Sequence, residues 1–259
     1  MLVQPAEEVT GHADVQAARQ ASEGCRPRSG FLGMTELNLD LGDLGVVSAL
    51  LERPVDAWLL YVIAHGAGAG MRHSFLQSIS AALATRGVAT MRYQFPYMEA
   101  GSRRPDPPAV VEATVRAAVS RAAVEAPELP LIAGGKSFGG RMTSGAAASS
   151  LPGVRGLVFL GFPLHPPGRP GTRRADHLVR VDLPMLFLQG TRDQFAQTDL
   201  ITGVCQRLGS RATLHPVEGA DHSFGVLKSS GRTPAAVLDE LAGTLVQWVR
   251  SRVLGENRR

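Results

Sequence analysis

The sequence predicts an α/β domain built on a doubly wound, mainly parallel sheet with flanking helices. Three observations predict this class. Short apolar runs alternate with longer segments of helical spacing, glycine or proline bounds most of the runs, and 259 residues suffice for one such domain. Strands that alternate with helices form parallel sheets through right-handed crossovers. We expect the domain to span residues 34–255 and to lack a separate cap domain.

Residues 1–33 differ from the rest of the chain, because they are polar, rich in alanine, glycine and glutamate, and without apolar periodicity. A segment with little apolar surface to bury is predicted to be a flexible tail. The ordered pattern begins at Met34, which suggests the hypothesis that Met34 is the native start and that the preceding residues are a misassigned extension. Detection of peptides from residues 1–33 in the native host would contradict this hypothesis.

Six short runs rich in β-branched, aromatic or leucine residues are the predicted strands. They cover residues 58–64, 88–93, 129–133, 156–160, 184–189 and 213–217. Nearly continuous apolar runs of this length are typical of strands that are buried on both faces, as in a parallel sheet.

The segments between these strands carry helical spacing. Residues 74–86 place Leu76, Ile79 and Leu83 along one face, and Gly87 follows as a stop signal. Further helices are expected over residues 108–124, 141–149, 195–208 and 234–253. The connection over residues 163–183 is rich in proline and arginine. Its length of about twenty residues is unusual inside a domain and indicates a functional loop or a small lid.

A Gly-x-Ser-x-Gly motif, from Gly135 to Gly139, directly follows the predicted strand at 129–133 and precedes a predicted helix. Alone the motif is weak, but a strand, a sharp turn and a helix with serine at the apex form a nucleophile elbow. The flanking glycines leave room for the tight turn, and the turn exposes the hydroxyl of Ser137 at the sheet edge. The alternative interpretation is a glycine-rich turn with a solvated serine.

A neutral serine is a poor nucleophile and needs a base. Asp193 follows the predicted strand at 184–189, and His222 follows the last predicted strand. This order of serine, acid and histidine is the one expected for a catalytic triad on such a sheet. We therefore expect His222 to be the base and Asp193 to orient it. The alternatives are that Asp193 caps the helix beginning near Phe195 and that His222 is a solvated loop residue.

Backbone N–H groups are expected to stabilise the oxyanion of the tetrahedral intermediate. One donor is predicted to be Phe138, the residue after the nucleophile. The second is expected in the small-residue loop from His65 to Gly70, with Ala67 and Gly68 as equal candidates.

Several basic and aromatic side chains are candidates for substrate binding. Lys136, Arg141 and Arg92, together with Arg72, Arg103 and Arg104, fall in motifs near the carboxyl edge of the sheet and are suited to a carboxylate or phosphate. Ordinary surface positions are the alternative. Three aromatic residues are candidates either for lining an acyl pocket or for packing beneath the loops: Phe95, Tyr97 and Phe162.

Other features argue against several classes of function. The formal net charge of +4 comes from scattered charges without a nucleic-acid-binding motif, so no nucleic-acid partner is expected. A phosphate-loop reading of Gly135-Lys136-Ser137 fails because its first glycine would fall on Pro130. Cys25 and Cys205 make neither a disulfide framework nor a metal site. We expect no cofactor and no metal.

No apolar run approaches 18 residues, and the N-terminus lacks the pattern of a signal peptide. No membrane partner is therefore expected, and the default expectation is a cytoplasmic location.

Six segments between about residues 65 and 224 carry a family resemblance: HGAGAGMRH, RYQFPYMEAGSRRPDPP, GGKSFGGRM, GFPLHPPGRP, QGTRD and GADHSF. The sequence resembles the α/β-hydrolase branch that contains testis-expressed protein 30, the NSL chromatin-complex subunit and bacterial dienelactone hydrolase-like proteins. The resemblance implies the same fold and the triad Ser137, Asp193 and His222. True dienelactone hydrolases have cysteine as the nucleophile, so that particular activity is not implied.

These observations together predict a serine hydrolase that cleaves a small ester, thioester or lactone through an acyl-enzyme on Ser137. The expected partner is a small acyl substrate. Two alternatives remain open: a non-catalytic scaffold that retains the fold, as the relatives in chromatin complexes suggest, and an acyltransferase or peptidase with the same triad.

Overall fold

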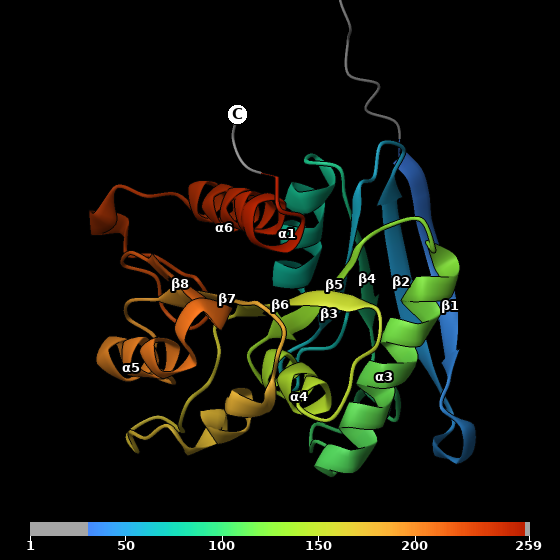
Figure 1. Ribbon diagram of the computed structural model, residues 1–259, viewed down its shortest axis with the longest axis horizontal. Helices are drawn as coiled ribbons and strands as arrows, with labels where there is room; N and C mark the ends of the chain where they lie inside the picture. The colour runs from blue at the N-terminus through green and yellow to red at the C-terminus, as the bar shows by residue number, and fades with distance from the viewer. Residues whose placement is uncertain (1–30, 257–259) are drawn as a thin grey trace, which may run out of the picture.

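Eight strands form one sheet in the order β1-β2-β4-β3-β5-β6-β7-β8 in the computed structural model, which describes residues 31–256 (Figure 1). The strands are β1 (Phe31–Asp40), β2 (Val46–Pro54), β3 (Leu59–Ala64), β4 (Val88–Tyr93), β5 (Leu131–Lys136), β6 (Val154–Leu160), β7 (Met185–Gly190) and β8 (Ala212–Val217). The predicted fold class, a mainly parallel sheet flanked by helices, is confirmed.

Strands β3 to β8 are parallel and correspond to the six predicted runs, with ends that differ by up to a few residues. Every residue of β3, β4 and β7 is buried. This is the burial expected of parallel strands with helices on both faces, and it explains why the runs are almost continuously apolar.

Strands β1 and β2 form an antiparallel hairpin that the sequence analysis did not identify, and β2 also pairs antiparallel with β4. β1 is the edge strand and is largely exposed between Gly33 and Asp40, and its apolar and polar residues alternate from Glu36 to Asp40 instead of forming the continuous apolar run of a buried strand. β1 begins at Phe31, before the expected domain start at Met34. The rest of the predicted tail, residues 1–30, lies outside the described residues.

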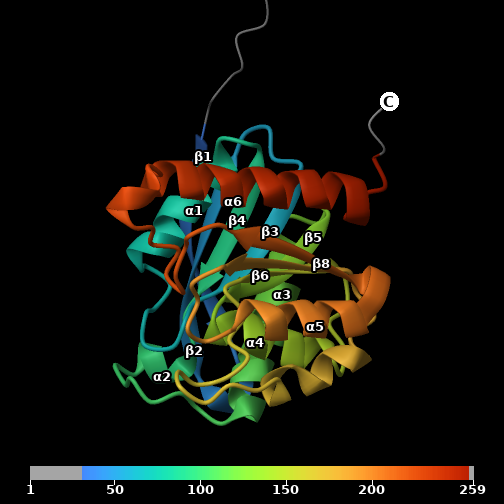
Figure 2. The same cartoon turned by 90° about the vertical axis from the view of Figure 1, so that its left-hand side faces the viewer.

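The helices form two layers, one on each face of the sheet (Figures 1 and 2). α1 (Ser74–Ala84) and α6 (Pro234–Trp248) cover one face, and α6 continues into a π-helical turn at Val249–Val253. α3 (Pro108–Glu125), α4 (Phe138–Ala147) and α5 (Thr198–Leu208) cover the other. Two separate apolar cores lie between these layers and the sheet.

Two shorter elements complete the chain. α2 (Pro96–Glu99) follows β4, and the 3₁₀ segment η2 (Arg173–Arg180) lies within the proline- and arginine-rich connection between β6 and β7. Within residues 31–256, no helix combines the length and the apolar character needed to cross a bilayer.

The parallel strands place their carboxyl ends along one edge of the sheet, where ligands of such sheets usually bind. His65 follows β3, Ser137 follows β5, Asp193 lies three residues past the end of β7, and His222 lies in the loop after β8. Residues far apart in sequence are therefore brought to the same edge.

Candidate active site

Ser137 lies at the apex of the turn between β5 and α4, with φ at 51°. Positive φ is strained for a residue with a side chain and costs about 1–3 kcal/mol. Glycine is required at positions 135 and 139 because neighbouring backbone lies too close to leave room for a side chain. A Cβ on Gly135 would lie 2.4 Å from the carbonyl oxygen of Ala64, and one on Gly139 would lie 2.5 Å from that of His65. The sequence thus builds a strained turn that holds the serine hydroxyl at the edge of the sheet.

A chain of hydrogen bonds joins Ser137, His222 and Asp193. The Oγ of Ser137 lies 2.8 Å from Nε2 of His222, and Nδ1 of His222 lies 2.7 Å from Oδ2 of Asp193. The Asp193 side chain is fully buried. A carboxylate only accepts, so Nδ1 carries the proton of the neutral imidazole and Nε2 accepts from the serine hydroxyl. This arrangement prepares Nε2 to take the serine proton.

Two further donors hold the carboxylate of Asp193. Nε2 of Gln189 donates to Oδ2 at 2.5 Å, and the N–H of Phe195 donates to Oδ1 at 2.8 Å. Oε1 of Gln189 in turn accepts the N–H of Phe162 at 2.8 Å. Asp193 does not cap α5, because that helix begins later, at Thr198. Sequence reasoning missed Gln189, although a polar residue near the end of the apolar strand β7 was a usable signal.

The loop that carries His222 is fixed by its own side chains. Oδ1 of Asp221 accepts the N–H groups of Ser223 and Gly225, at 2.8 and 2.9 Å. The ring of Phe195 packs against the His222 imidazole, with centroids 4.3 Å apart. Asp221 therefore shapes the loop and leaves the imidazole to Asp193.

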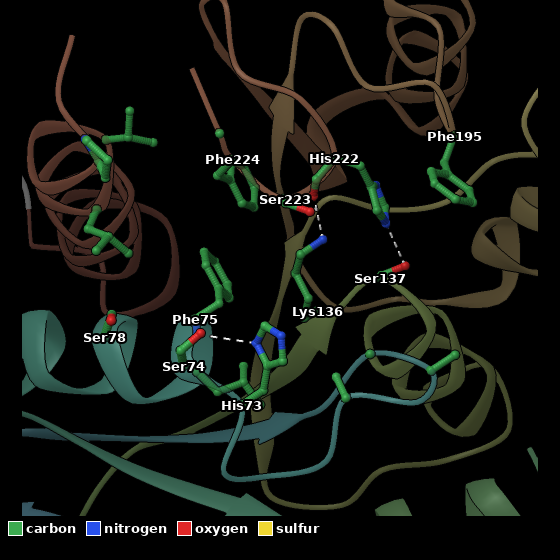
Figure 3. A pocket seen from close by; sticks show the side chains of 18 residues that line it. His73, Ser74, Phe75, Ser78, Lys136, Ser137, Phe195, His222, Ser223 and Phe224 are labelled. Atoms are coloured by element: carbon green, nitrogen blue, oxygen red, sulfur yellow. Dashed lines mark hydrogen bonds between the residues drawn. The ribbon is translucent and has the colours of Figure 1, made fainter. Parts of the chain in front are cut away.

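Lys136, a predicted substrate-binding residue, is engaged with this same loop. Its Nζ donates to the backbone carbonyl of His222 at 2.6 Å (Figure 3). Burial lowers the pKa of Lys136 to about 8, and the carboxylates of Asp193 and Asp221 oppose that shift. A Cβ on Gly161 would lie 3.1 Å from Nζ, so glycine there leaves space for the ammonium group. Lys136 thus supports the position of the histidine loop while it also lines the pocket described below.

His65 fixes the loop that follows β3. It is fully buried, its Nδ1 donates to the carbonyl of Gly66 at 2.8 Å, and its Nε2 accepts the N–H of Phe95 at 3.2 Å. These bonds require the neutral imidazole, and burial lowers the pKa of His65 to about 4. The loop with Ala67 is therefore held by a histidine whose role the sequence did not reveal.

A pocket of about 600 Å³ opens beside Ser137 and His222, between the N-terminal ends of α1 and α6 (Figure 3). Most of its wall is apolar, and aromatic rings at positions 75 and 224 stack with centroids 5.5 Å apart. The apolar and small residues that line it are Gly66, Ala67, Ala69, Phe75, Leu76, Phe195, Phe224, Gly225, Pro234, Val237 and Leu238. We call this cavity the acyl pocket, after the role that is proposed for it below.

The two candidates for the second oxyanion donor differ in position. Ala67 lines the acyl pocket, whereas Gly68 does not. The N–H of Ala67 makes no hydrogen bond to any described residue. Phe138 is the first residue of α4, so its N–H has no acceptor within the helix. Both N–H groups are therefore available to a bound ligand.

The other predicted binding residues lie elsewhere. Arg92 is buried on β4 and pairs with Glu52 at 3.2 Å, in a separate cavity, so its position does not suit a role in the acyl pocket. Arg141 borders a second pocket beside α4. The aromatic candidates Phe95, Tyr97 and Phe162 are buried in the core and do not line the acyl pocket. Phe75, Phe195 and Phe224 supply its aromatic wall instead, and the sequence analysis did not identify them.

Residues 31–256 contain no group of three or more histidine, cysteine, aspartate or glutamate side chains arranged to hold a metal ion.

Solved structures share this architecture over most of the chain. A dienelactone hydrolase from Anabaena variabilis aligns with a TM-score of 0.68 at 18% identity, covering 85% of this chain and 98% of that one. An α/β serine hydrolase without a lid from Xanthomonas campestris aligns with a TM-score of 0.66 at 21% identity, covering 88% and 98%. An esterase domain from a Rhodothermus marinus protein aligns with a TM-score of 0.64 at 18% identity, covering 85% and 98%.

Identities this low show a shared fold. The family evidence comes from the sequence itself, because the sequence model of the family described as "Alpha/beta hydrolase domain" matches residues 58–250. That match includes both elements of the expected oxyanion hole and all three residues of the hydrogen-bonded chain. The protein belongs to the α/β-hydrolase family.

Proposed function

We propose that this protein is a serine hydrolase that cleaves a small ester, thioester or lactone through an acyl-enzyme on Ser137. The observation that carries the proposal is the continuous hydrogen-bond chain from Ser137 through His222 to the buried carboxylate of Asp193, at the mouth of an apolar pocket.

The chemistry follows from the geometry. As Oγ of Ser137 attacks the carbonyl carbon, Nε2 of His222 takes the hydroxyl proton, and Asp193 stabilises the imidazolium that forms. The imidazolium then gives this proton to the departing alcohol or thiol. A water molecule, activated by the same histidine, attacks the acyl-serine and releases the acid.

The tetrahedral intermediates place negative charge on the former carbonyl oxygen. We assign its stabilisation to the N–H groups of Phe138 and Ala67, and we prefer Ala67 to Gly68 because Ala67 lines the acyl pocket. One such donor contributes about 10²–10³ in rate. His65 supports this function indirectly, because it fixes the carbonyl of the neighbouring Gly66.

The form of the acyl pocket supports a small or medium apolar acyl group as the part of the substrate that it holds. Aromatic and aliphatic side chains dominate its wall, and its volume suits a ligand of modest size. A scaffold that had lost catalysis would gain nothing from a strained serine, two free N–H groups and a buried carboxylate aligned on one histidine. This argument favours a hydrolase over the scaffold alternative.

A fluorophosphonate probe tests the proposal without knowledge of the substrate, because it reacts only with activated serines. We expect stoichiometric labelling of the wild-type protein and none of Ser137→Ala. Ser149→Ala is the matched control, since Ser149 lies just past α4 and outside the pocket. Absence of labelling of the folded wild-type protein, or labelling that persists in Ser137→Ala, would contradict the proposal.

A further inference from the structure

A further cavity lies beside the turn at Ser137, and four of its nine lining residues are arginines. Its volume is about 470 Å³, and Arg141, Arg169, Arg173 and Arg174 line it together with His165. Arg141 comes from the first turn of α4, whereas the other three come from the connection between β6 and β7. We call this cavity the arginine pocket.

No acidic side chain balances this charge in the described part of the chain. No carboxylate lines the arginine pocket, and none of its four guanidinium groups forms an ion pair within residues 31–256. Asp176 is the nearest acid along η2, but it does not line the cavity. Most other arginines with buried or half-buried side chains have a carboxylate partner, for example Arg92 with Glu52 and Arg121 with Glu125. Within residues 31–256, Arg141 and Arg174 are half-buried and lack such a partner, whereas Arg169 and Arg173 are exposed at the rim of the same cavity.

Fixed contacts hold η2, which carries Arg173 and Arg174, close to α4, which carries Arg141. The Ser144 hydroxyl on α4 donates to the carbonyl of Arg141 and lies 2.7 Å from Nε2 of His177 on η2. Arg211 donates to the carbonyls of Val179 and Val181, at 3.1 and 2.6 Å, and so fixes the end of η2. Gathering arginines around a cavity is electrostatically unfavourable unless an anion occupies it, because like charges repel at short range.

The arginine pocket adjoins the candidate catalytic residues. The N–H of Arg141 donates to the carbonyl of Ser137, one helical turn before it, at 3.1 Å. The N–H of His165 donates to the carbonyl of Phe195, whose ring packs on His222 and also lines the acyl pocket. The two cavities share no lining residue, but the backbone joins them, because Arg141 and His165 of the arginine pocket bond to the carbonyls of Ser137 and Phe195, which line the acyl pocket.

We propose that the arginine pocket binds a multiply charged oxyanion, of the phosphate or phosphoester class. Guanidinium groups suit this chemistry because their planar forks donate two parallel hydrogen bonds to phosphate oxygens. Anion binding in the arginine pocket does not depend on the proposed hydrolase function. A second part of the proposal does rest on that function: the bound anion is a group on the leaving-group side of the substrate, while the acyl pocket holds the acyl chain.

Isothermal titration with inorganic phosphate at constant ionic strength tests the site directly. The pocket variant is Arg173→Gln/Arg174→Gln. The matched control is Arg155→Gln/Arg180→Gln, which removes the same charge from exposed positions outside the cavity. We expect the wild-type protein and the control to bind phosphate with similar Kd and the pocket variant to bind at least about 10-fold more weakly. Absence of binding by the wild-type protein, or equal weakening in both variants, would overturn the site.

Kinetics distinguish a substrate group from a free anion. Two aryl butyrates are compared, one neutral and one with a phosphate on the aryl leaving group. If the anion belongs to the substrate, the pocket variant raises KM for the phosphorylated ester about 10-fold and leaves kcat and the neutral ester unchanged. If phosphate still binds but the two esters respond alike, the substrate assignment is wrong and the source is a free anion. A protein that binds phosphate yet hydrolyses neither ester retains the site and loses the catalytic proposal.

Discussion

The two cavities beside the turn that carries Ser137 differ in the chemistry of their walls. The acyl pocket is walled by aromatic and aliphatic side chains, and its one cation, Lys136, is engaged by a backbone carbonyl. The arginine pocket is lined by four arginines that form no ion pair within residues 31–256, together with His165 and uncharged residues. Apolar walls recognise size and shape, whereas clustered cations recognise charge. Under the proposed mechanism, this contrast favours a substrate with an apolar acyl part and an anionic leaving part.

The largest expected effect comes from removal of the Ser137 hydroxyl. Ser137→Ala should lower kcat by about 10⁴–10⁶-fold for neutral and phosphorylated esters alike, because both react at the same hydroxyl. The measurement is steady-state hydrolysis of the paired butyrates, with Ser149→Ala as control. Activity of the Ser137→Ala variant on only one ester would separate the two pockets and break the comparison.

Acid should affect the two pockets differently. The acyl pocket depends on neutral His65, whereas arginines stay charged at any working pH. Because the folded state lowers the pKa of His65 from 6.5 to about 4, the neutral form stabilises the fold. That stability is complete above about pH 6.5 and is lost as pH falls toward 4, by about 3 kcal/mol.

Urea unfolding between pH 7 and pH 4 measures this loss. His65→Gln should be less stable at pH 7 and should show a shallower pH dependence, since His65 no longer titrates. His73→Asn is the control, because His73 is exposed at the start of α1 and asparagine keeps a side-chain acceptor for the N–H of Phe75 at this N-cap. An unchanged pH slope in His65→Gln would contradict the assignment.

Loss of the hydrogen bond that holds Asp193 should slow the hydrolysis of the neutral and the phosphorylated ester alike. Gln189→Leu removes the buried amide that donates to Asp193. A hydrogen bond to a charged group contributes about 1.5–3 kcal/mol, so kcat should fall by about 10–100-fold for both esters. Gln206→Leu, at an exposed position on α5, serves as control. Wild-type activity of Gln189→Leu would show that Asp193 needs no such support.

A bulky residue at the rim should affect the acyl pocket alone. Ser78 lines that pocket from an exposed position on α1 (Figure 3). Ser78→Phe should lower kcat/KM for hexanoate relative to acetate esters by about 10-fold, because the ring occupies space for the longer chain. Phosphate affinity should not change. Ala81→Phe, exposed on the same helix and outside the pocket, is the control, and an equal effect there would contradict the assignment of the acyl side.

The smallest expected effect concerns the arginine pocket alone. Arg174→Gln relieves repulsion with Arg141, whose pKa is lowered by burial and by the nearby Arg174 charge. Thermal unfolding without phosphate should give a Tm a few degrees higher than that of the wild-type protein, and added phosphate should stabilise the wild-type protein more. A lower Tm of the variant without phosphate would show that Arg174 makes stabilising contacts instead.

The sequence was sufficient to predict those parts of the molecule in which the local residue pattern and the global fold agree. Apolar runs gave the parallel strands, and the order of Ser137, Asp193 and His222 along the chain anticipated their meeting at one edge of the sheet. Of the hairpin, β1 was missed because an exposed edge strand lacks the continuous apolar run of the buried ones, whereas β2 does carry a mostly buried apolar run that the sequence analysis did not assign.

The residues that line the two pockets could not be predicted from the sequence, because tertiary packing decides which side chains meet there. Phe75 and Phe224 lie 149 positions apart (224 − 75) and stack only because α1 meets the loop after β8. Arg92 and Arg141 were equal candidates for substrate binding in the sequence. In the structure, Arg92 is buried against Glu52, whereas Arg141 borders an open cavity. Which side chain faces which cavity depends on strand register and helix rotation, and motif spacing does not specify these.

The most direct test of the central claim is to trap the acyl-enzyme and locate it. The protein is mixed with p-nitrophenyl butyrate, quenched in acid within the first turnover, digested and analysed by mass spectrometry. We predict a butyryl group on Ser137, a burst of nitrophenol equal to the enzyme concentration if deacylation is slower than acylation, and no modification in Ser137→Ala. Hydrolysis of the ester without a butyryl group on Ser137, or with the group on another residue, would contradict the account.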